Sequence, residues 1–214
     1  MPIEAKICGI TETTGLAAAR DGGAAFAGFV FYPRSPRYIA PRAAAALSAQ
    51  RGKMRSAAVT VDLPDTQLAA ILDTVAIDVI QLHGAETPER VAQVRRRFGR
   101  PVMKSVAIAG PADVERARGY FDVADRLLFD AKPPKDAPDA LPGGNALSFD
   151  WTLLSGETWP LPWMLSGGLT PGTVGEAARI SGAPAVDVSS GVESAPGVKD
   201  PARIADFLAA CRDV

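Results

Sequence analysis

Histidine, cysteine and net charge are all scarce in this sequence, and each scarcity removes a class of function. Only one histidine, His83, occurs in 214 residues, so a metal centre built from several histidines is excluded. The two cysteines, Cys8 and Cys211, lie near opposite ends of the chain and have the spacing of neither a zinc site nor a disulfide framework. Lys and Arg number 23 against 24 Asp and Glu, a formal net charge of -1. Nucleic-acid-binding proteins usually carry a basic excess instead.

Long apolar runs are also missing. No segment approaches the roughly 18 consecutive apolar residues that indicate a membrane-spanning helix. The first six residues lack the basic and apolar parts of a secretory signal. These absences predict a cytoplasmic protein in a reducing compartment, with neither membrane nor nucleic acid as a partner. No long exposed apolar stripe is evident, so we expect a monomer.

The sequence does contain a regular alternation of short β-rich runs and amphipathic, alanine-rich segments. The predicted strands are residues 5–9, 25–31, 56–61, 79–82, 101–106, 126–129, 163–166 and 185–188. The predicted helices are residues 14–20, 41–50, 66–74, 87–98, 112–119, 173–181 and 201–212. Most of the strands are almost continuously apolar, as parallel strands covered on both faces are. Strict alternation of this kind predicts a parallel sheet with helical crossovers.

Eight such units predict an α/β protein, a single (β/α)₈ barrel that forms one catalytic domain over residues 1–214. Barrels of this class usually have about 250 residues, so we expect at least one outer helix to be reduced, and residues 150–154 are the candidate. A doubly wound open sheet is the alternative. That fold usually has fewer strands, and the G-x-G-x-x-G motif that often follows its first strand is absent here.

In a barrel of this class the active site forms at the carboxyl ends of the strands. Several residues there can carry acid–base or ligand-binding chemistry. They are Cys8, Gly9, Tyr32, Asp62, His83, Ser105, Asp130, Ser166, Gly167, Gly168, Ser189, Ser190 and Gly191. Geometry alone selects this set, before any motif is considered.

Cys8 and Asp130 are the candidate base and acid, although each has a plain structural interpretation. A lone strand cysteine is often only a packing residue, and a strand-end aspartate often caps a turn. Lys6 shares a strand face with Cys8, so its ammonium can help to hold a thiolate. An inward Lys6 would itself need a carboxylate partner, because a buried unpaired charge is very costly. Cys211 lies in the last predicted helix, and we expect it only to pack.

Two glycine- and serine-rich turns follow the seventh and eighth strands. Loops at these two positions recurrently bind phosphate in this fold, so Gly167, Gly168, Ser189, Ser190 and Gly191 are the candidate phosphate ligands. Arg34 and Arg37 flank the turn after the second strand, and arginine suits a planar carboxylate. His83 can polarise a substrate or simply tie a loop, and the residues leave that choice open.

At this point the sequence resembles the phosphoribosylanthranilate isomerases of tryptophan biosynthesis. Matching blocks run in order along nearly the whole chain. They are KICGIT (6–11), GFVFYP (28–33), SPRYI (35–39), QLHG (81–84), LFD (128–130), FDW (149–151), LSGGL (165–169) and DVSSGVE (187–193). Taken together, the blocks are highly specific.

The resemblance implies an Amadori rearrangement of N-(5'-phosphoribosyl)anthranilate, with no metal or organic cofactor and a small phosphorylated substrate as partner. By the family pattern Cys8 is the general base, Asp130 the general acid, and Arg37 the residue that holds the anthranilate carboxylate. We also expect substrate contacts from Gln81, His83 and Asp187, which lie in matching blocks.

The chain departs from the family pattern in two places. The third strand, around residues 58–62, is more polar than usual, and Ala146 stands where a glycine is usual. Ala146 lies in the long loop at 131–148, which is predicted to be an active-site lid because it is too long for a simple connector.

Three alternatives remain at this stage. A pentose-phosphate epimerase is disfavoured because its metal site needs several histidines, and an indole-glycerol-phosphate synthase because the expected lysine and glutamate pattern is missing. The third is a barrel that senses a phosphorylated metabolite without converting it. Consumption of phosphoribosylanthranilate, followed by fluorescence, would separate an enzyme from such a sensor.

Overall fold

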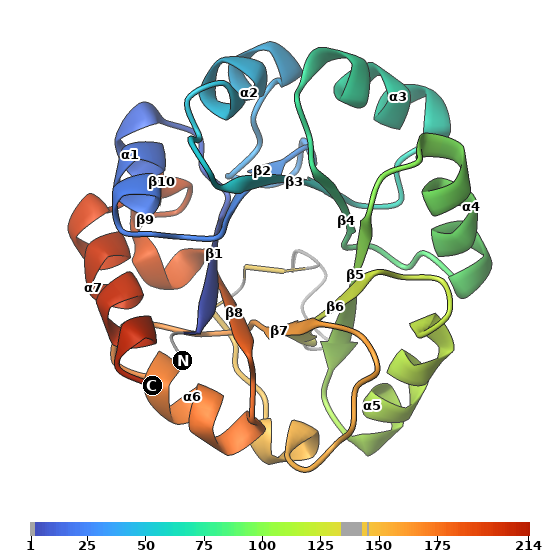
Figure 1. Ribbon diagram of the computed structural model, residues 1–214, viewed down its shortest axis with the longest axis vertical. Helices are drawn as coiled ribbons and strands as arrows, with labels where there is room; N and C mark the ends of the chain where they lie inside the picture. The colour runs from blue at the N-terminus through green and yellow to red at the C-terminus, as the bar shows by residue number, and fades with distance from the viewer. Residues whose placement is uncertain (1–2, 134–142, 145) are drawn as a thin grey trace.

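Eight parallel strands close into a barrel, and an outer ring of helices surrounds it (Figure 1). The computed structural model describes residues 3–133, 143–144 and 146–214. Strand order around the barrel follows the chain, and β8 pairs with β1 to close it. The strands are β1 Glu4–Cys8, β2 Phe26–Val30, β3 Arg55–Thr60, β4 Val79–Leu82, β5 Val102–Ile108, β6 Arg126–Ala131, β7 Trp163–Leu165 and β8 Ala185–Val188. The predicted (β/α)₈ barrel is therefore confirmed.

Helices separate most of the strands, as the alternation predicted. They are α1 Thr13–Asp21, α2 Pro41–Ser48, α3 Asp65–Thr74, α4 Pro88–Phe98, α5 Pro111–Ala117, α6 Val174–Ser181 and α7 Pro201–Arg212. Proline occupies the first turn of four of them, α2, α4, α5 and α7, where its missing N–H costs no helical hydrogen bond. Every barrel strand and every α-helix lies within two residues of its predicted bounds.

The crossover from β6 to β7 is the reduced one. Its described part contains only a 3₁₀ turn, η2 Trp151–Leu154, where the sequence predicted a shortened helix at residues 150–154. Two further 3₁₀ turns occur, η1 Arg118–Tyr120 after α5 and η3 Ser190–Val192 after β8. A short antiparallel hairpin, β9 Glu193–Ala195 and β10 Val198–Lys199, follows η3. The sequence did not predict this hairpin.

The barrel interior changes from apolar to polar along the strands. One buried cluster contains an inward residue from seven strands: Phe26, Ala57, Val79, Met103, Leu128, Met164 and Ala185. Side chains two residues apart share a face of a strand. Two residues further along β4 to β8, this same inward face carries Gln81, Ser105, Asp130, Ser166 and Asp187. An apolar plug thus fills one end of the barrel, and polar groups occupy the end where the strands finish.

The larger apolar cluster lies between the strands and the helices. In the part of the chain that the structure describes, no helix has both the length and the apolar character needed to cross a membrane.

Helix α7 tests how much the outer layer contributes to stability. Phe207 is fully buried and belongs to the cluster between strands and helices. We expect Phe207→Ala to lower the free energy of unfolding by about 3–5 kcal/mol, because it leaves a cavity. The exposed neighbour Asp206 is the matched control. Asp206→Ala should change the free energy of unfolding by less than about 0.5 kcal/mol. Denaturant unfolding measures both, and equal effects would show that α7 does not pack as described.

Candidate active site

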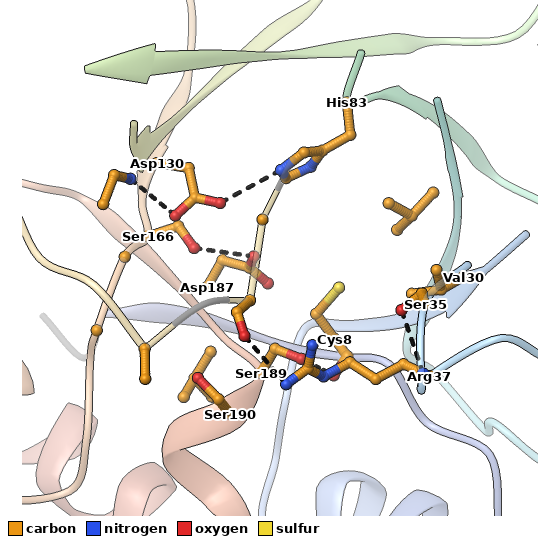
Figure 2. A pocket seen from close by; sticks show the side chains of 18 of the residues that line it. Cys8, Val30, Ser35, Arg37, His83, Asp130, Ser166, Asp187, Ser189 and Ser190 are labelled. Carbon is orange, nitrogen blue, oxygen red and sulfur yellow. Dashed lines mark hydrogen bonds and ion pairs between the residues drawn. The ribbon is translucent and has the colours of Figure 1, made fainter. Parts of the chain in front are cut away.

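A cavity opens at the carboxyl ends of the strands, with a volume of about 770 Å³ including its solvent-open mouth. Figure 2 shows side chains from several strands and loops converging on it. The lining residues that the sequence selected are Cys8, Tyr32, Arg37, His83, Asp130, Ser166, Gly167, Gly168, Asp187, Ser189 and Ser190. Five other selected residues, Gly9, Asp62, Gln81, Ser105 and Gly191, are not among the lining residues. The cavity therefore brings together candidates from six segments of the chain.

Lys6 lies beneath Cys8 and is fully buried. Its Nζ lies 2.8 Å from Oδ1 of Asp187, on the neighbouring strand β8. Asp187 is thus the carboxylate partner that an inward Lys6 requires, and its Oδ2 also accepts a hydrogen bond from the Ser166 hydroxyl. Burial lowers the pKa of Lys6, but attraction to Asp187 and Cys8 outweighs it and raises that pKa to about 12. Lys6 is therefore a permanent cation next to the thiol.

Opposing effects act on the Cys8 thiol. Burial raises the pKa of Cys8 and is the largest effect; the Lys6 ammonium lowers it and the Asp187 carboxylate raises it again. The net pKa lies above that of a free thiol. Lys6 therefore acts in the expected direction, but without substrate it does not overcome desolvation. Gly28 on β2 makes this arrangement possible, because a Cβ there would lie 3.0 Å from Sγ and 3.2 Å from the Lys6 Nζ.

Asp130 contacts the single histidine. His83 Nε2 lies 3.2 Å from Asp130 Oδ2, and His83 Nδ1 lies 2.9 Å from Nε2 of Gln81 (Figure 2 shows the first contact). The Gln81 amide nitrogen can only donate, so Nδ1 accepts and Nε2 carries the proton that it donates to Asp130. The other Asp130 oxygen, Oδ1, accepts from the backbone N–H of Ala131. Gln81 is fully buried, so it reaches the cavity only through His83.

Arg37 is buried and already has a charged partner. Its Nε donates to Oε1 of Glu193 at 2.7 Å, and its Nη2 donates to Oε2 at 2.9 Å. Glu193 also accepts from Lys199 Nζ at 2.7 Å. Burial alone would raise the pKa of Glu193, but Arg37 and Lys199 hold it below its usual value. Arg34, the other arginine that flanks the turn after β2, is exposed.

Glu193 and Lys199 are the residues that sequence reasoning missed. Glu193 ends the block at residues 187–193, so a signal was present, but its contact with Arg37 spans 156 positions. Lys199 lies outside every block and carried no signal. Burial lowers the pKa of Lys199 more than Glu193 raises it.

The two glycine-rich turns lie side by side at the cavity wall. Gly167 and Gly168 both have positive φ, 91° and 65°, which glycine adopts without strain. A Cβ on Gly191 would lie 1.9 Å from the carbonyl oxygen of Leu169, so Gly191 allows the second turn to pack on the first. The Ser189 hydroxyl donates to the carbonyl of Cys8 and accepts from Lys199. Its one hydrogen is therefore already used.

The loop at 131–148 contributes its described residues to the cavity. A Cβ on Gly143 would lie 2.5 Å from His83 Nε2 and 2.7 Å from Asp130 Oδ2, so only glycine fits against the candidate acid. The Gly144 carbonyl accepts from Arg37 at 3.2 Å. Ala146, which replaces the usual glycine, has φ 57°, a left-handed conformation that strains alanine. Most of the predicted lid, at 134–142 and 145, lies outside the described residues.

Comparison with known proteins identifies the family. A model of the family described as N-(5'-phosphoribosyl)anthranilate (PRA) isomerase matches residues 5–210. A relative of that name from Rhodospirillum centenum is 58% identical over 210 residues, which cover 98% of both chains.

Solved structures agree with the family model. One of them is described as mutually generated monomers of the dimeric phosphoribosylanthranilate isomerase from Thermotoga maritima. It matches with a TM-score of 0.85 and 32% identity, and the match covers 99% of this chain and 100% of that one. A phosphoribosylanthranilate isomerase in complex with reduced 1-(o-carboxyphenylamino)-1-deoxyribulose 5-phosphate gives the same TM-score, identity and coverage. The fold, the cavity and these comparisons agree, and the chain belongs to the N-(5'-phosphoribosyl)anthranilate isomerase family.

Proposed function

We propose that Cys8 is the general base and Asp130 the general acid of the isomerisation that this cavity carries out. The chain is an isomerase of tryptophan biosynthesis that converts N-(5'-phosphoribosyl)anthranilate to 1-(2-carboxyphenylamino)-1-deoxyribulose 5-phosphate. One observation supports these roles most strongly. Cys8 and Asp130 line the same cavity, although they come from the non-adjacent strands β1 and β6. The Cys8 thiol has a buried cation beside it, and the Asp130 carboxyl group is hydrogen-bonded to His83.

The proposed chemistry needs one acid and one base. Protonation of the furanose ring oxygen by Asp130 breaks the C1–O bond, and the nitrogen lone pair forms a Schiff base at C1. The Cys8 thiolate then removes the proton from C2, and the electron pair moves to give an enolamine. That intermediate gains a proton at C1 and loses the C2 hydroxyl proton, which leaves the ketone. C1 is reduced as C2 is oxidised, so no external oxidant or reductant is required.

His83 supports the acid in this scheme. Because Gln81 donates to Nδ1, His83 presents an N–H to Asp130 Oδ2, the oxygen that the Ala131 backbone N–H does not engage. His83 would therefore stabilise the carboxylate that remains after Asp130 has given up its proton, and Gln81 would hold the His83 ring in that orientation. Asp187 lines the cavity, but its strongest contact is with Lys6. Its contribution to substrate binding would come through Oδ2, next to Ser166.

The two charged ends of the substrate match two parts of the cavity. Arg37 would hold the anthranilate carboxylate with its Nη1, which has no hydrogen-bond partner among the described residues, since Glu193 already occupies its Nε and one hydrogen of Nη2. The phosphate would bind at the turns that contain Gly167, Gly168, Ser189, Ser190 and Gly191. Because the Ser189 hydroxyl is already engaged, this turn would bind mainly with backbone N–H groups.

The oligomeric state we propose is a monomer. Among the described residues, the exposed large apolar side chains are Tyr38, Leu147, Val198 and Val214, too few for the apolar core that a permanent homodimer interface has. The Thermotoga maritima relative is described as dimeric, so sedimentation velocity on this chain decides the question.

Replacing the thiol tests the base directly. We expect Cys8→Ser to lower kcat by at least about 10²-fold, because serine nearly preserves size but ionises far less readily. Fluorescence of the anthranilate group follows substrate consumption. Cys211→Ser is the matched control, since Cys211 is a buried packing residue on α7, and it should retain activity. Near-normal turnover by folded Cys8→Ser would exclude the thiolate mechanism.

The pH profile gives a second measure of the same base. The pKa of Cys8 is raised by burial, so the thiolate form increases as pH rises through that pKa and is lost as pH falls. We expect kcat/KM to keep rising in the alkaline range, beyond where a free thiol would be ionised. A flat profile over that range would mean that another group limits the reaction.

Arg37 and Arg34 separate carboxylate binding from general positive charge. We expect Arg37→Ala to raise KM and to weaken the binding of product analogues that retain the carboxylate. Analogues without the carboxylate should lose little affinity. Arg34 is exposed, so Arg34→Ala should change either value by less than about twofold, because screened surface charges contribute little. Equal behaviour of the two variants in steady-state kinetics would contradict the role of Arg37.

A further inference from the structure

We propose that Glu193 is a positioning residue that couples the two anion-binding ends of the cavity, orienting Arg37 directly and the Ser189 turn through Lys199. This inference rests on the function proposed above, because it assumes that Arg37 holds the carboxylate and that the Ser189 turn holds the phosphate. Neither Glu193 nor Lys199 is among the residues that line the cavity. Both therefore act through the residues that they hold.

The Glu193 carboxylate decides which edge of Arg37 faces the substrate. Two parallel hydrogen bonds, at 2.7 and 2.9 Å, engage Nε and Nη2. Such a paired contact fixes the plane of the guanidinium as well as its position. The second hydrogen of Nη2 is donated to the Gly144 carbonyl, so Nη2 has no hydrogen left for a substrate. Among the described residues, Nη1 has no hydrogen-bond partner, so it is the nitrogen with which Arg37 would reach a substrate carboxylate.

Lys199 connects the same carboxylate to the phosphate end. Its Nζ has three acceptors: Glu193 Oε1 at 2.7 Å, the Ser189 carbonyl at 2.9 Å and the Ser189 hydroxyl at 3.2 Å. An ammonium has three hydrogens, so Lys199 has none left for a substrate. Ser189 extends this hydrogen-bond network, since its hydroxyl donates to the carbonyl of Cys8. The network therefore reaches the backbone of the proposed base.

The β9–β10 hairpin explains how the two residues meet. Glu193 and Lys199 are register partners across its two strands, and opposed residues of an antiparallel pair have adjacent side chains. Both are buried, with about 6% of each residue exposed. The hairpin thus sets a carboxylate and an ammonium side by side between the β2 loop and the β8 turn. Arg37, Lys199 and Glu193 together carry a single net positive charge, which leaves the site attractive to the anionic substrate.

A double-mutant cycle tests the coupling. The variants are Glu193→Gln, Arg37→Ala and both together, and the probe is reduced 1-(o-carboxyphenylamino)-1-deoxyribulose 5-phosphate, titrated into each folded protein. If Glu193 acts through Arg37, Glu193→Gln should weaken binding about tenfold in the wild-type background and much less in the Arg37→Ala background. The loss of the negative charge in Glu193→Gln would by itself make the protein bind the anionic analogue more tightly. Tighter binding by Glu193→Gln, or additive losses in the cycle, would overturn the proposal.

Inorganic phosphate, used as a competitive inhibitor, tests the second arm. Glu193→Gln and Lys199→Met should each raise its inhibition constant, because the Ser189 turn loses its support, whereas Arg37→Ala should leave that constant nearly unchanged. An unchanged constant in Lys199→Met would overturn the link through Lys199. If Arg37→Ala leaves analogue binding intact, the proposed role of Arg37 fails and this inference with it. Additive losses, in contrast, leave the role of Arg37 standing.

Glu193→Gln leaves two buried cations without their partner, so it requires a folding control. The double variant Glu193→Gln with Lys199→Met removes one charge of each sign and keeps the net charge of the cluster. We expect it to bind the analogue at least about tenfold more weakly than wild type while circular dichroism remains native. Wild-type affinity in this charge-balanced protein would overturn the proposal.

Discussion

Charges that face the closed interior of a barrel cannot reach bulk water, so each needs a partner on another segment. This constraint shapes the whole site. Lys6 is paired with Asp187 across β1 and β8, and Arg37 and Lys199 share Glu193. Pairs of this kind add little net stability, because desolvation offsets their attraction, yet breaking one is costly. Their consequence here is geometric: each pair holds a cavity residue in one place.

The same burial creates an electrostatic problem for the proposed base. Desolvation raises the pKa of Cys8, and the adjacent Lys6 opposes that shift without reversing it. A base with a raised pKa is a stronger proton acceptor once ionised, but less of it is ionised at neutral pH. The glycine at position 28 keeps thiol and ammonium close. Because Gly28 has no side chain, Lys6 can lie against the thiol, and it is the residue of β1 that lowers the pKa of Cys8.

Several site features were readable from the sequence because they depend on local periodicity. A strand has a two-residue repeat, so an apolar inward residue such as Leu128 implies that Asp130 also faces inward, at the end where the strand finishes. The glycine-rich turns after β7 and β8 were readable because their composition is local and the order of the strands along the chain places them. Gln81 shows the limit of this reasoning. Its face was predictable, but its full burial behind His83 depended on how the neighbouring strands pack.

The sequence by itself determined the eight strands, the reduced crossover before β7 and the identities of Cys8, Asp130 and Arg37 as candidates, because apolar runs, periodicity and family blocks are local signals. Only the tertiary structure decided which charges meet. Lys6 and Asp187 are 181 positions apart, and Arg37 and Glu193 are 156 apart. The first contact exists because β8 closes on β1. The second exists because a three-residue strand and a two-residue strand form a hairpin beneath Arg37, and elements that short leave almost no periodic signal in a sequence.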